Sequence, residues 1–372
     1  MHIVSDILGF IKNTKKSLSN LKPTALLSGV TLLTLLTSLS IAGEAHASTQ
    51  VPSSRLALLS KGINGDNIVN NTFVANYTSD DTAQLKAMGM TYIRIPIDPS
   101  WIIAAAPVEN QKPYSDAARA AIGVARLDAA VAQFAQSGFA VMLVIQPQPK
   151  LRAMTAAQQE KIITRAVSLI VKRYAPLYTP DQLFFETLNE PKFDPAVWNT
   201  YVAQLVALIR QTAPAHTIIV PPVRADNPDF FPSLTPLADQ NIVYTMHIYQ
   251  PAGITSQGAG VMPQPNYRFP QAPGSPNPQE WTTDRLSAFM HEGIDWAAAN
   301  NVPLIINEFG ATSIADPTSR MNWVNFVRQT AEANHIGWAW WSQTGRLYGL
   351  RPRGAAWDAA LVQALGNPPT GN

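Results

Sequence analysis

Short apolar segments alternate with longer segments of helical periodicity along most of the chain. Segments rich in Val, Ile and aromatic residues predict strands at Leu58–Ile63, Tyr92–Ile95, Ala140–Ile145, Leu183–Thr187, Thr217–Val220, Ile242–Met246, Leu304–Ile306 and Gly337–Trp341. Strands that are apolar throughout, without strict alternation, are typical of a parallel sheet covered by helices on both faces. The pattern therefore favours an α/β fold.

The segments between the predicted strands carry apolar residues at helical spacing. The clearest example has apolar positions at i, i+3, i+4, i+7, i+10 and i+11, namely Trp198, Tyr201, Val202, Leu205, Leu208 and Ile209. Other helices are predicted at about 80–89, 115–137, 156–174, 284–300, 319–334 and 355–365, and a weak one, interrupted by three prolines, at 226–239. Eight strand–helix units favour a single (β/α)₈ TIM barrel over an open doubly wound sheet. The phosphate-binding glycine motifs of nucleotide-binding sheets are absent from the sequence.

Residues 1–47 have the pattern of a secretory signal peptide, and we expect residues 48–372 to form a single folded domain. Four lysines precede the uncharged apolar run Pro23–Gly43, and Ala45-His46-Ala47 matches the A-x-A pattern of a cleavage site. The apolar run is also long enough to span a bilayer as an uncleaved anchor. The position of the A-x-A pattern favours cleavage. We therefore expect an exported protein, secreted or periplasmic, with no stable membrane insertion after cleavage.

Charge and composition exclude several kinds of partner. The formal net charge is +2, and the four lysines and two acidic residues of the first 47 residues account for all of it. The rest of the chain is formally neutral and lacks a basic stripe, which argues against nucleic acid as a partner. The chain has no cysteine, and its histidines lack His-x-His or H-E-x-x-H spacing. We therefore predict no metal and no cofactor, and we expect a monomer.

Polar side chains concentrate where the predicted strands end. These positions are Arg94, Gln146, Asn189, Glu190, His247, Tyr249, Glu308 and the cluster Trp338, Trp340 and Trp341. In a barrel, the carboxyl ends of the strands meet at one mouth, which carries the catalytic residues. A single glutamate after a strand is commonly a neighbour of a helix cap, but Glu190 and Glu308 follow the fourth and seventh strands. Such a pair suits glycosidic bond cleavage, with Glu190 protonating the leaving oxygen and Glu308 attacking the anomeric carbon.

Flat aromatic side chains at the same mouth are candidates for stacking on sugar rings. The stronger candidates are Trp341 and Trp101, and the weaker ones are Trp281, Tyr267 and Phe269 on the proline-rich connection 248–283. The three tryptophans of the eighth strand alternate across it, so some of them must belong to the core.

The stretch Glu-Thr-Leu-Asn-Glu-Pro at 186–191 resembles the signature of glycoside hydrolase family 5, within a clan of (β/α)₈ retaining glycosidases. The resemblance extends from Gly62-Ile63-Asn64 to the eighth strand. It implies that Glu190 is the acid/base and that Glu308, in Glu308-Phe309-Gly310, is the nucleophile. The positions that match the family's substrate-binding residues are Arg94, Asn189, His247, Tyr249 and Trp341.

The resemblance also implies individual roles. Arg94 would position the nucleophile, Asn189 would bind the sugar 2-hydroxyl, and Trp341 would form the floor of the subsite beside the cleaved bond. One position departs from the family, because Gln146 stands where a histidine is common. An amide still binds a hydroxyl but does not titrate, so the chemistry is unaffected and the preferred sugar stays open.

The implied activity is hydrolysis of a β-glycan with retention, through a covalent glycosyl-enzyme on Glu308. The leading hypothesis is an exported endo-β-1,4-glucanase, a cellulase whose partner is a polysaccharide or oligosaccharide. Alternatives are a β-mannanase, an exo-acting β-glucosidase or 1,3-glucanase, and a non-catalytic carbohydrate-binding barrel. A retaining mechanism requires the two carboxyl groups to lie about 5–5.5 Å apart.

Overall fold

The computed structural model describes residues 50–66, 68–70, 77–108, 115–259, 267–271, 281–352 and 354–366. The predicted export segment, residues 1–47, lies outside these residues, as does much of the proline-rich connection 248–283. No helix in the described part of the chain combines the length and the apolar composition needed to cross a membrane.

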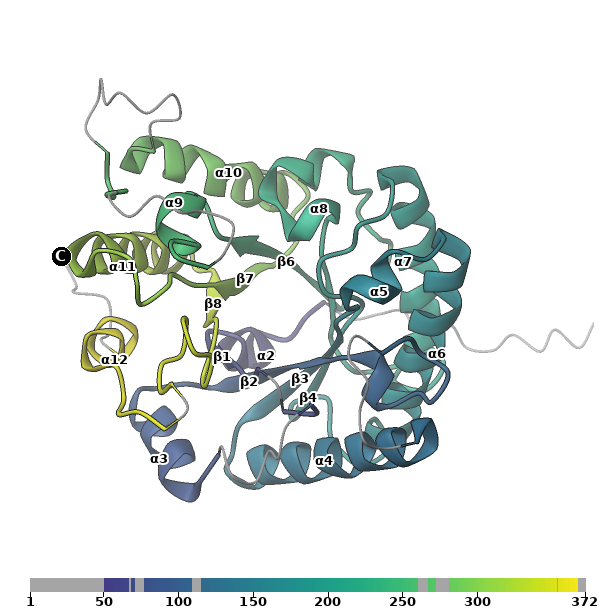
Figure 1. Cartoon of the computed structure of the whole chain (residues 1–372). Helices are drawn as coiled ribbons and strands as arrows, with labels where there is room; N and C mark the ends of the chain where they lie inside the picture. Colours follow the sequence, from purple (N-terminus) through teal and green to yellow (C-terminus); the bar gives the residue numbers. More distant parts are fainter. Residues whose placement is uncertain are drawn as a thin grey trace, which may run out of the picture. The chain divides into compact units, whose positions relative to one another are not determined.

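Eight parallel strands, joined in sequence order, form a closed barrel in which β8 pairs with β1 (Figure 1). The strands are β1 Lys61–Asn64, β2 Tyr92–Ile97, β3 Ala140–Ile145, β4 Leu183–Glu186, β5 Ile218–Val220, β6 Ile242–Ile248, β7 Leu304–Phe309 and β8 Gly337–Trp340. The predicted (β/α)₈ TIM barrel is therefore confirmed. Strands β6 and β7 continue past their predicted ends through the polar site residues His247, Asn307 and Glu308, and β2 continues through Pro96 to Ile97.

Helices surround the strands, and the principal ones follow the predicted segments (Figure 1). They are α3 Ser79–Ala87, α4 Asp116–Gln136, α6 Ala156–Tyr174, α7 Pro195–Arg210, α10 Thr283–Ala299, α11 Pro317–Ala333 and α12 Ala359–Gly366. Shorter helical segments are α2 Ser53–Leu58, η2 Pro99–Trp101, α5 Pro149–Arg152, α8 Val223–Asp226, η3 Pro228–Ser233 and α9 Ala252–Thr255. Side-chain caps at Thr78, Ser115, Thr155 and Asp194 begin four of the long helices.

Two predicted elements differ from the structure. The first strand was expected at Leu58–Ile63, but Ser53–Leu58 forms α2 and the strand begins at Lys61. The apolar signal came from Leu59, which is fully buried among the side chains at the bottom of the barrel. The weak helix expected at 226–239 is replaced by the 3₁₀ helix η3, whose Pro232 prevents regular α-helical hydrogen bonding.

The interior of the barrel is apolar at its amino-terminal end and polar at its carboxyl-terminal end. A separate apolar cluster fills its amino-terminal part with Leu59, Tyr92, Ala140, Met142, Phe184, Ile219, Val243, Ile305 and Ala339. Because side chains alternate along a strand, the next inward position lies two residues further on. After Tyr92, Phe184 and Ile305 these positions hold Arg94, Glu186 and Asn307, which are also buried. The apolar floor thus supports a polar layer at the carboxyl ends of the strands.

A β-bulge in β7 brings Glu308 into this polar layer. The register with β6 pairs Met246 with Ile306 but His247 with Glu308, so one extra residue lies on β7. Strict alternation would turn Glu308 away from the barrel interior once Asn307 points inward. The extra residue lets both consecutive side chains reach the mouth, and bulges commonly re-aim side chains beside active sites.

Candidate active site

Arg94 lies at the centre of the polar layer and is fully buried. Its Nε and Nη2 donate to the two oxygens of Glu186 at 2.6 and 2.8 Å, and its Nη1 donates to Glu308 Oε1 at 2.5 Å. Further hydrogen bonds reach Asn64 Oδ1 at 2.9 Å and Asn189 Oδ1 at 2.8 Å. One cation therefore fixes two carboxylates and two amides at the carboxyl ends of β1, β4 and β7.

Glu308 is held at both carboxylate oxygens. Arg94 binds Oε1, and the hydroxyl of Tyr249 donates to Oε2 at 3.0 Å. The side chain of Glu308 is only 5% exposed. Burial and the charge of Glu308 raise the pKa of Tyr249 well above its usual value, so the phenol stays protonated and able to donate. These contacts hold the Glu308 carboxylate in a fixed orientation.

Glu190 is held differently, in the loop that follows β4. Its backbone has a φ of 47°, in the left-handed region that non-glycine residues seldom adopt. Arg152 on α5 donates to the carbonyl oxygens of Glu190 at 2.6 Å and Asn189 at 3.3 Å, which anchors this backbone. The Glu190 side chain is 28% exposed, and its Oε1 lies 3.5 Å from Nδ1 of His247.

The two glutamates predicted as a pair face each other. One carboxylate oxygen of Glu190 and one of Glu308 lie within 4.8 Å of each other and of a ring nitrogen of His247. His247 Nδ1 is 3.5 Å from Glu190 and 3.7 Å from Glu308. The structure thus brings together Arg94, Asn189, Glu190, His247, Tyr249 and Glu308.

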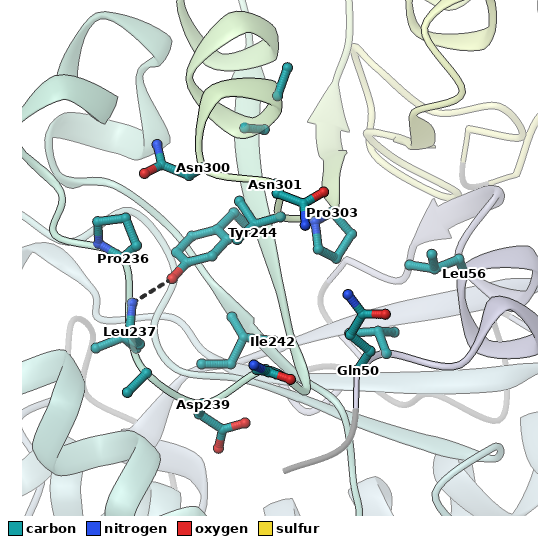
Figure 2. A pocket seen from close by; sticks show the side chains of 16 residues that line it. Gln50, Leu56, Pro236, Leu237, Asp239, Ile242, Tyr244, Asn300, Asn301 and Pro303 are labelled. Carbon is teal, nitrogen blue, oxygen red and sulfur yellow. Dashed lines mark hydrogen bonds between the residues drawn. The ribbon is translucent and has the colours of Figure 1, made fainter.

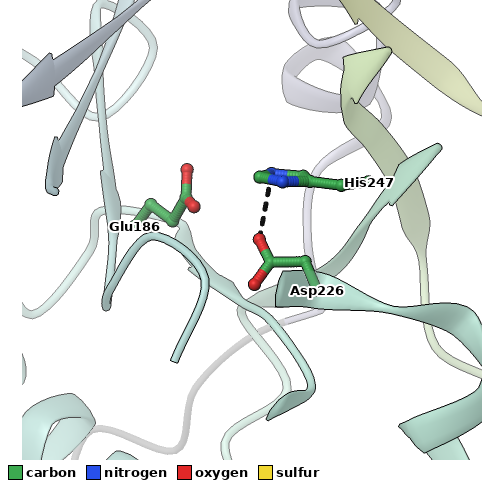
Figure 3. A group of neighbouring side chains, drawn as sticks. All are labelled: Glu186, Asp226 and His247. Atoms are coloured by element: carbon green, nitrogen blue, oxygen red, sulfur yellow. Dashed lines mark ion pairs between the residues drawn. The ribbon is translucent and has the colours of Figure 1, made fainter. Parts of the chain in front are cut away.

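Asp226, at the end of α8, binds the far side of the His247 ring. Its Oδ2 lies 2.9 Å from Nε2 of His247, an ion pair that Figure 3 shows beside Glu186. Burial by itself lowers the pKa of His247, but the charges of Asp226 and Glu308 outweigh this and raise it well above the usual value. Burial raises the pKa of Asp226 to about 7, and the charge of His247 only partly offsets this.

The same surroundings act on Glu190. Burial raises the pKa of its carboxyl group, but the close contact and charge of His247, with the charge of Arg152, more than reverse this. The net pKa of Glu190 is lower than its usual value. Before substrate binds, the local proton therefore resides on His247 in preference to Glu190.

Glu186, Asp226 and His247 also have the composition of a metal site (Figure 3). Each offers a ligand atom within 4.8 Å of the others. Both oxygens of Glu186, however, already accept hydrogen bonds from the guanidinium of Arg94, and Oε2 accepts another from Asn307. The arginine supplies the positive charge that a cation would bring, so these residues fit a hydrogen-bonded network better than a metal site.

Most of the aromatic candidates for sugar stacking are buried, which corrects the sequence-based expectation. Trp101 is 3% exposed, because η2 packs against α4 and the guanidinium of Arg126 lies 5.2 Å from its ring. The weaker candidates Trp281, Tyr267 and Phe269 belong to the main hydrophobic core. Of the eighth-strand tryptophans, Trp338 and Trp340 are fully buried, while Trp341 keeps partial exposure at the mouth.

Several residues of the network were not predicted. These are Asn64, Arg152, Glu186, Asp226 and Asn307. Glu186 and Asn307 carried a usable signal, since each is a polar residue at an inward position of an otherwise apolar strand. Gln146 lies at the end of β3 and is partly exposed, with its backbone N–H bonded to Ile97.

A cavity of about 600 Å³ lies far from this network, at the amino ends of β6 and β7 (Figure 2). Its lining includes Ile242, Tyr244 and Pro303. The Tyr244 hydroxyl accepts a hydrogen bond from the backbone N–H of Leu237 at 2.8 Å. In this type of barrel the amino-terminal face contributes stability and the carboxyl-terminal face carries catalysis. The cavity is therefore not the active site.

An eight-stranded barrel whose mouth holds two facing glutamates on an arginine network defines the class of (β/α)₈ glycoside hydrolases. Within this class, the family model Cellulase (glycosyl hydrolase family 5) matches residues 59–344. The chain therefore belongs to glycosyl hydrolase family 5, as the sequence resemblance predicted.

Individual relatives are more distant. Endoglucanase 3 of Fibrobacter succinogenes is 29% identical over 199 residues, which cover 44% of this chain and 30% of that protein. Endoglucanase C of Acetivibrio thermocellus is 24% identical over 209 residues, covering 50% and 60% of the two chains. The chain thus spans less than two thirds of the length of either relative.

Solved structures match over a larger share of the chain. Endoglucanase Cel5A of Thermotoga maritima superposes with a TM-score of 0.72 at 24% identity, covering 85% of this chain and 99% of that one. A mutant form of the same enzyme in complex with cellobiose has a TM-score of 0.72 at 26% identity, covering 86% and 100%. The fold is therefore shared along nearly the whole length of these enzymes.

Proposed function

We propose that this protein is a retaining endo-β-1,4-glucanase. The observation that carries the proposal is the separation of the Glu190 and Glu308 carboxylates, whose nearest oxygens lie within 4.8 Å. This is close to the spacing of about 5–5.5 Å in retaining glycosidases and well below the roughly 6.5–9.5 Å of inverting ones. The endoglucanase relatives and a structural neighbour with bound cellobiose support a β-1,4-glucan as the substrate.

In the proposed mechanism, Glu308 attacks the anomeric carbon. Its contacts with Arg94 and Tyr249 favour the ionised state that a nucleophile needs. Glu190 gives its proton to the leaving oxygen as the bond breaks. It then removes a proton from the water that releases the sugar from Glu308, so that both carboxyl groups return to their starting states.

Further residues of the mouth are proposed to bind the sugar. Asn189 Oδ1 already accepts a hydrogen bond from Arg94, which leaves the amide NH₂ to donate to the 2-hydroxyl. Trp341 offers a partly exposed aromatic face for stacking beside the cleaved bond. His247 and Tyr249 contact the two carboxylates and complete the subsite. The proposal requires no metal and no cofactor.

Residues 1–47 are proposed as a cleaved export signal, with residues 48–372 as a monomeric catalytic domain acting outside the cytoplasm. The support is the sequence pattern of lysines, apolar run and A-x-A site. Amino-terminal sequencing of the exported protein tests this, and the expected first residue is Ser48. An intact amino terminus on exported protein would instead indicate an anchor.

A substrate panel tests the function. The panel contains carboxymethylcellulose, barley glucan, mannan, xylan and laminarin, with measurement of product length and of the anomer formed first. We expect mixed-length products from carboxymethylcellulose and barley glucan, and initial release of the β-anomer.

Variants of the two glutamates test the same proposal. Glu190→Gln and Glu308→Gln should abolish turnover, whereas Glu292→Gln, at an exposed position on α10, should not. Near-normal activity of either site variant, or initial α-anomer, contradicts the proposal, and turnover of mannan alone would assign a β-mannanase.

A further inference from the structure

Asp226 is a buried acid that the mechanism above does not use. The side chain is fully buried, and among the described residues its oxygens have no hydrogen-bond partner besides His247. Aspartates that shape turns usually accept bonds from nearby backbone N–H groups, so a turn-forming role does not account for it. Its close contact is the ion pair with His247 Nε2 at 2.9 Å. Removing each ion of a buried pair from water costs several kcal/mol, so the presence of this ion pair needs an explanation.

The backbone around Asp226 is strained. Arg224, Ala225 and Asp226 have φ values of 62°, 66° and 53°, three consecutive non-glycine residues in the left-handed region. Each such residue costs roughly 1–2 kcal/mol, and strain of this kind concentrates at functional sites. The N–H of Arg224 also donates to the carbonyl of Pro191 at 2.9 Å, which ties this turn to the residue after Glu190.

The His247 ring connects Asp226 with both glutamates. Its Nε2 faces Asp226, and its Nδ1 lies 3.5 Å from Glu190 and 3.7 Å from Glu308. An acceptor at one ring nitrogen fixes both the rotation of an imidazole and the position of its protons. Asp226 therefore determines where Nδ1 points and whether it carries a proton.

We propose that Asp226 is a positioning residue that acts through His247, so that Nδ1 holds the proton which Glu190 delivers to the leaving group. In this step the proton leaves Nδ1 and bonds to a carboxylate oxygen of Glu190, which passes it to the glycosidic oxygen. In the second half of the reaction Glu190 takes a proton from water and returns it to Nδ1, so no proton is gained or lost. The inference rests on the proposed function, because it requires Glu190 as the acid.

The charges around this pair support a stored proton. The titratable and charged groups that face it are Arg94, Arg152, Glu186, Glu190, Tyr249 and Glu308. The raised pKa of His247 and the lowered pKa of Glu190 both place the proton on the histidine in the free site. Removing the negative charge of Asp226 should lower the pKa of His247 and that of Glu190, so the site should lose its proton at lower pH.

The test compares Asp226→Asn with Asp229→Asn, a matched change at an exposed position three residues further on. Two substrates are compared. In barley glucan the leaving group is a sugar hydroxyl, which needs protonation, whereas in 2,4-dinitrophenyl β-cellobioside it is dinitrophenolate, which does not. For Asp226→Asn we expect kcat/KM on glucan to fall about 10- to 100-fold, part of what general acid catalysis contributes. The rate of dinitrophenol release in the first turnover should stay within about threefold, because this step needs no proton.

The pH profile gives a second readout. In Asp226→Asn the basic limb of kcat/KM on glucan should move to lower pH by about one unit, as expected for loss of an opposite charge in contact. Asp226→Glu should restore part of this shift, and Asp229→Asn should match the wild type. Equal losses on both substrates with an unmoved basic limb would show a merely structural role and overturn the inference.

Glu190→Gln, measured in parallel, distinguishes a failure of the proposed function from a failure of the inference about Asp226. If Glu190→Gln loses as much activity on the dinitrophenyl substrate as on glucan, the proposed function is wrong. If Glu190→Gln loses far more on glucan but Asp226→Asn does not, only the inference about Asp226 is wrong. Should Asp226→Asn fail to fold by circular dichroism, ¹⁵N-histidine NMR of the wild type decides, with His247 assigned from a His247→Asn spectrum. We expect both ring nitrogens to be protonated at pH 6, and a neutral ring there would overturn the inference.

Discussion

The two glutamates at the mouth are chemically identical but are held in opposite ways. Glu308 is 5% exposed and has a partner at each oxygen, in Arg94 and Tyr249. Glu190 is 28% exposed, and its carboxylate contacts His247 at 3.5 Å and Arg152 at 4.0 Å. The environment thus stabilises one carboxylate as a fixed anion and leaves the other able to exchange a proton and move. This difference is what a nucleophile and an acid/base require.

The difference follows from where the chain places each residue. Glu308 belongs to β7, and the bulge directs it into the barrel beside the buried cation. Glu190 lies beyond the end of β4, in a left-handed backbone conformation. A strand surrounded by neighbouring strands gives a rigid support, whereas a loop permits adjustment. The following predictions test this contrast, beginning with the largest expected effect.

Arg94→Met should have the largest effect on stability. It leaves Glu186, 1% exposed, and Glu308 without their buried cation, and breaking a buried pair in this way costs about 3–5 kcal/mol. Chemical denaturation of the variant and the wild type measures the loss. Adding Glu186→Gln to Arg94→Met should recover part of it, because an uncompensated charge is then removed. A double variant less stable than Arg94→Met would contradict this explanation.

Arg152→Met tests the other glutamate and should cost less. Arg152 donates charged hydrogen bonds to the carbonyls of Glu190 and Asn189, and such bonds are worth about 1.5–3 kcal/mol. Its charge also lowers the pKa of Glu190, so its removal should raise that pKa. The basic limb of the pH–activity profile should therefore move to higher pH, opposite to the shift expected for Asp226→Asn. An unmoved limb would show that Arg152 only anchors the backbone.

Tyr249→Phe removes one of the two partners of Glu308 and leaves the other. The loss of a single hydrogen bond to an anion should lower kcat about tenfold, corresponding to about 1.5 kcal/mol. Tyr178→Phe, at a partly buried position in the segment between α6 and β4, serves as the control. If Tyr249→Phe keeps full activity, Arg94 alone suffices to hold the nucleophile.

The sequence predicted the barrel and the glutamate pair because both depend on local pattern. Apolar strands at regular intervals define the barrel, and polar residues at strand ends then share one mouth by topology alone. Asn307 was missed because the predicted strand ended at Ile306, so that its inward position was not recognised. Asp226 was missed because three left-handed residues without glycine leave no recognisable turn signal. Trp101 was misjudged because an aromatic residue after a strand suits both a sugar platform and a packed core. Only tertiary packing on α4 decides between them.

The smallest expected effect is at a surface ion pair, whose contribution to stability can be compared with that of the buried ion pairs of Arg94. Asp128 accepts hydrogen bonds from Arg173 and from the Tyr174 hydroxyl at 2.8 Å, but its side chain is 37% exposed. Burial raises its pKa, but the hydrogen bonds from Arg173 and Tyr174 and the charge of Arg173 together more than reverse this, so the folded pKa lies below the unfolded one. The resulting stability is present above the unfolded pKa and is lost as the pH falls through the folded value. Asp128→Asn should therefore cost only about 0.2–1 kcal/mol at pH 7, because solvent screens the pair, and the difference from wild type should vanish near pH 2. Denaturation at both pH values measures this, and a difference that persists in acid would assign the loss to packing of the Tyr174 ring in place of charge.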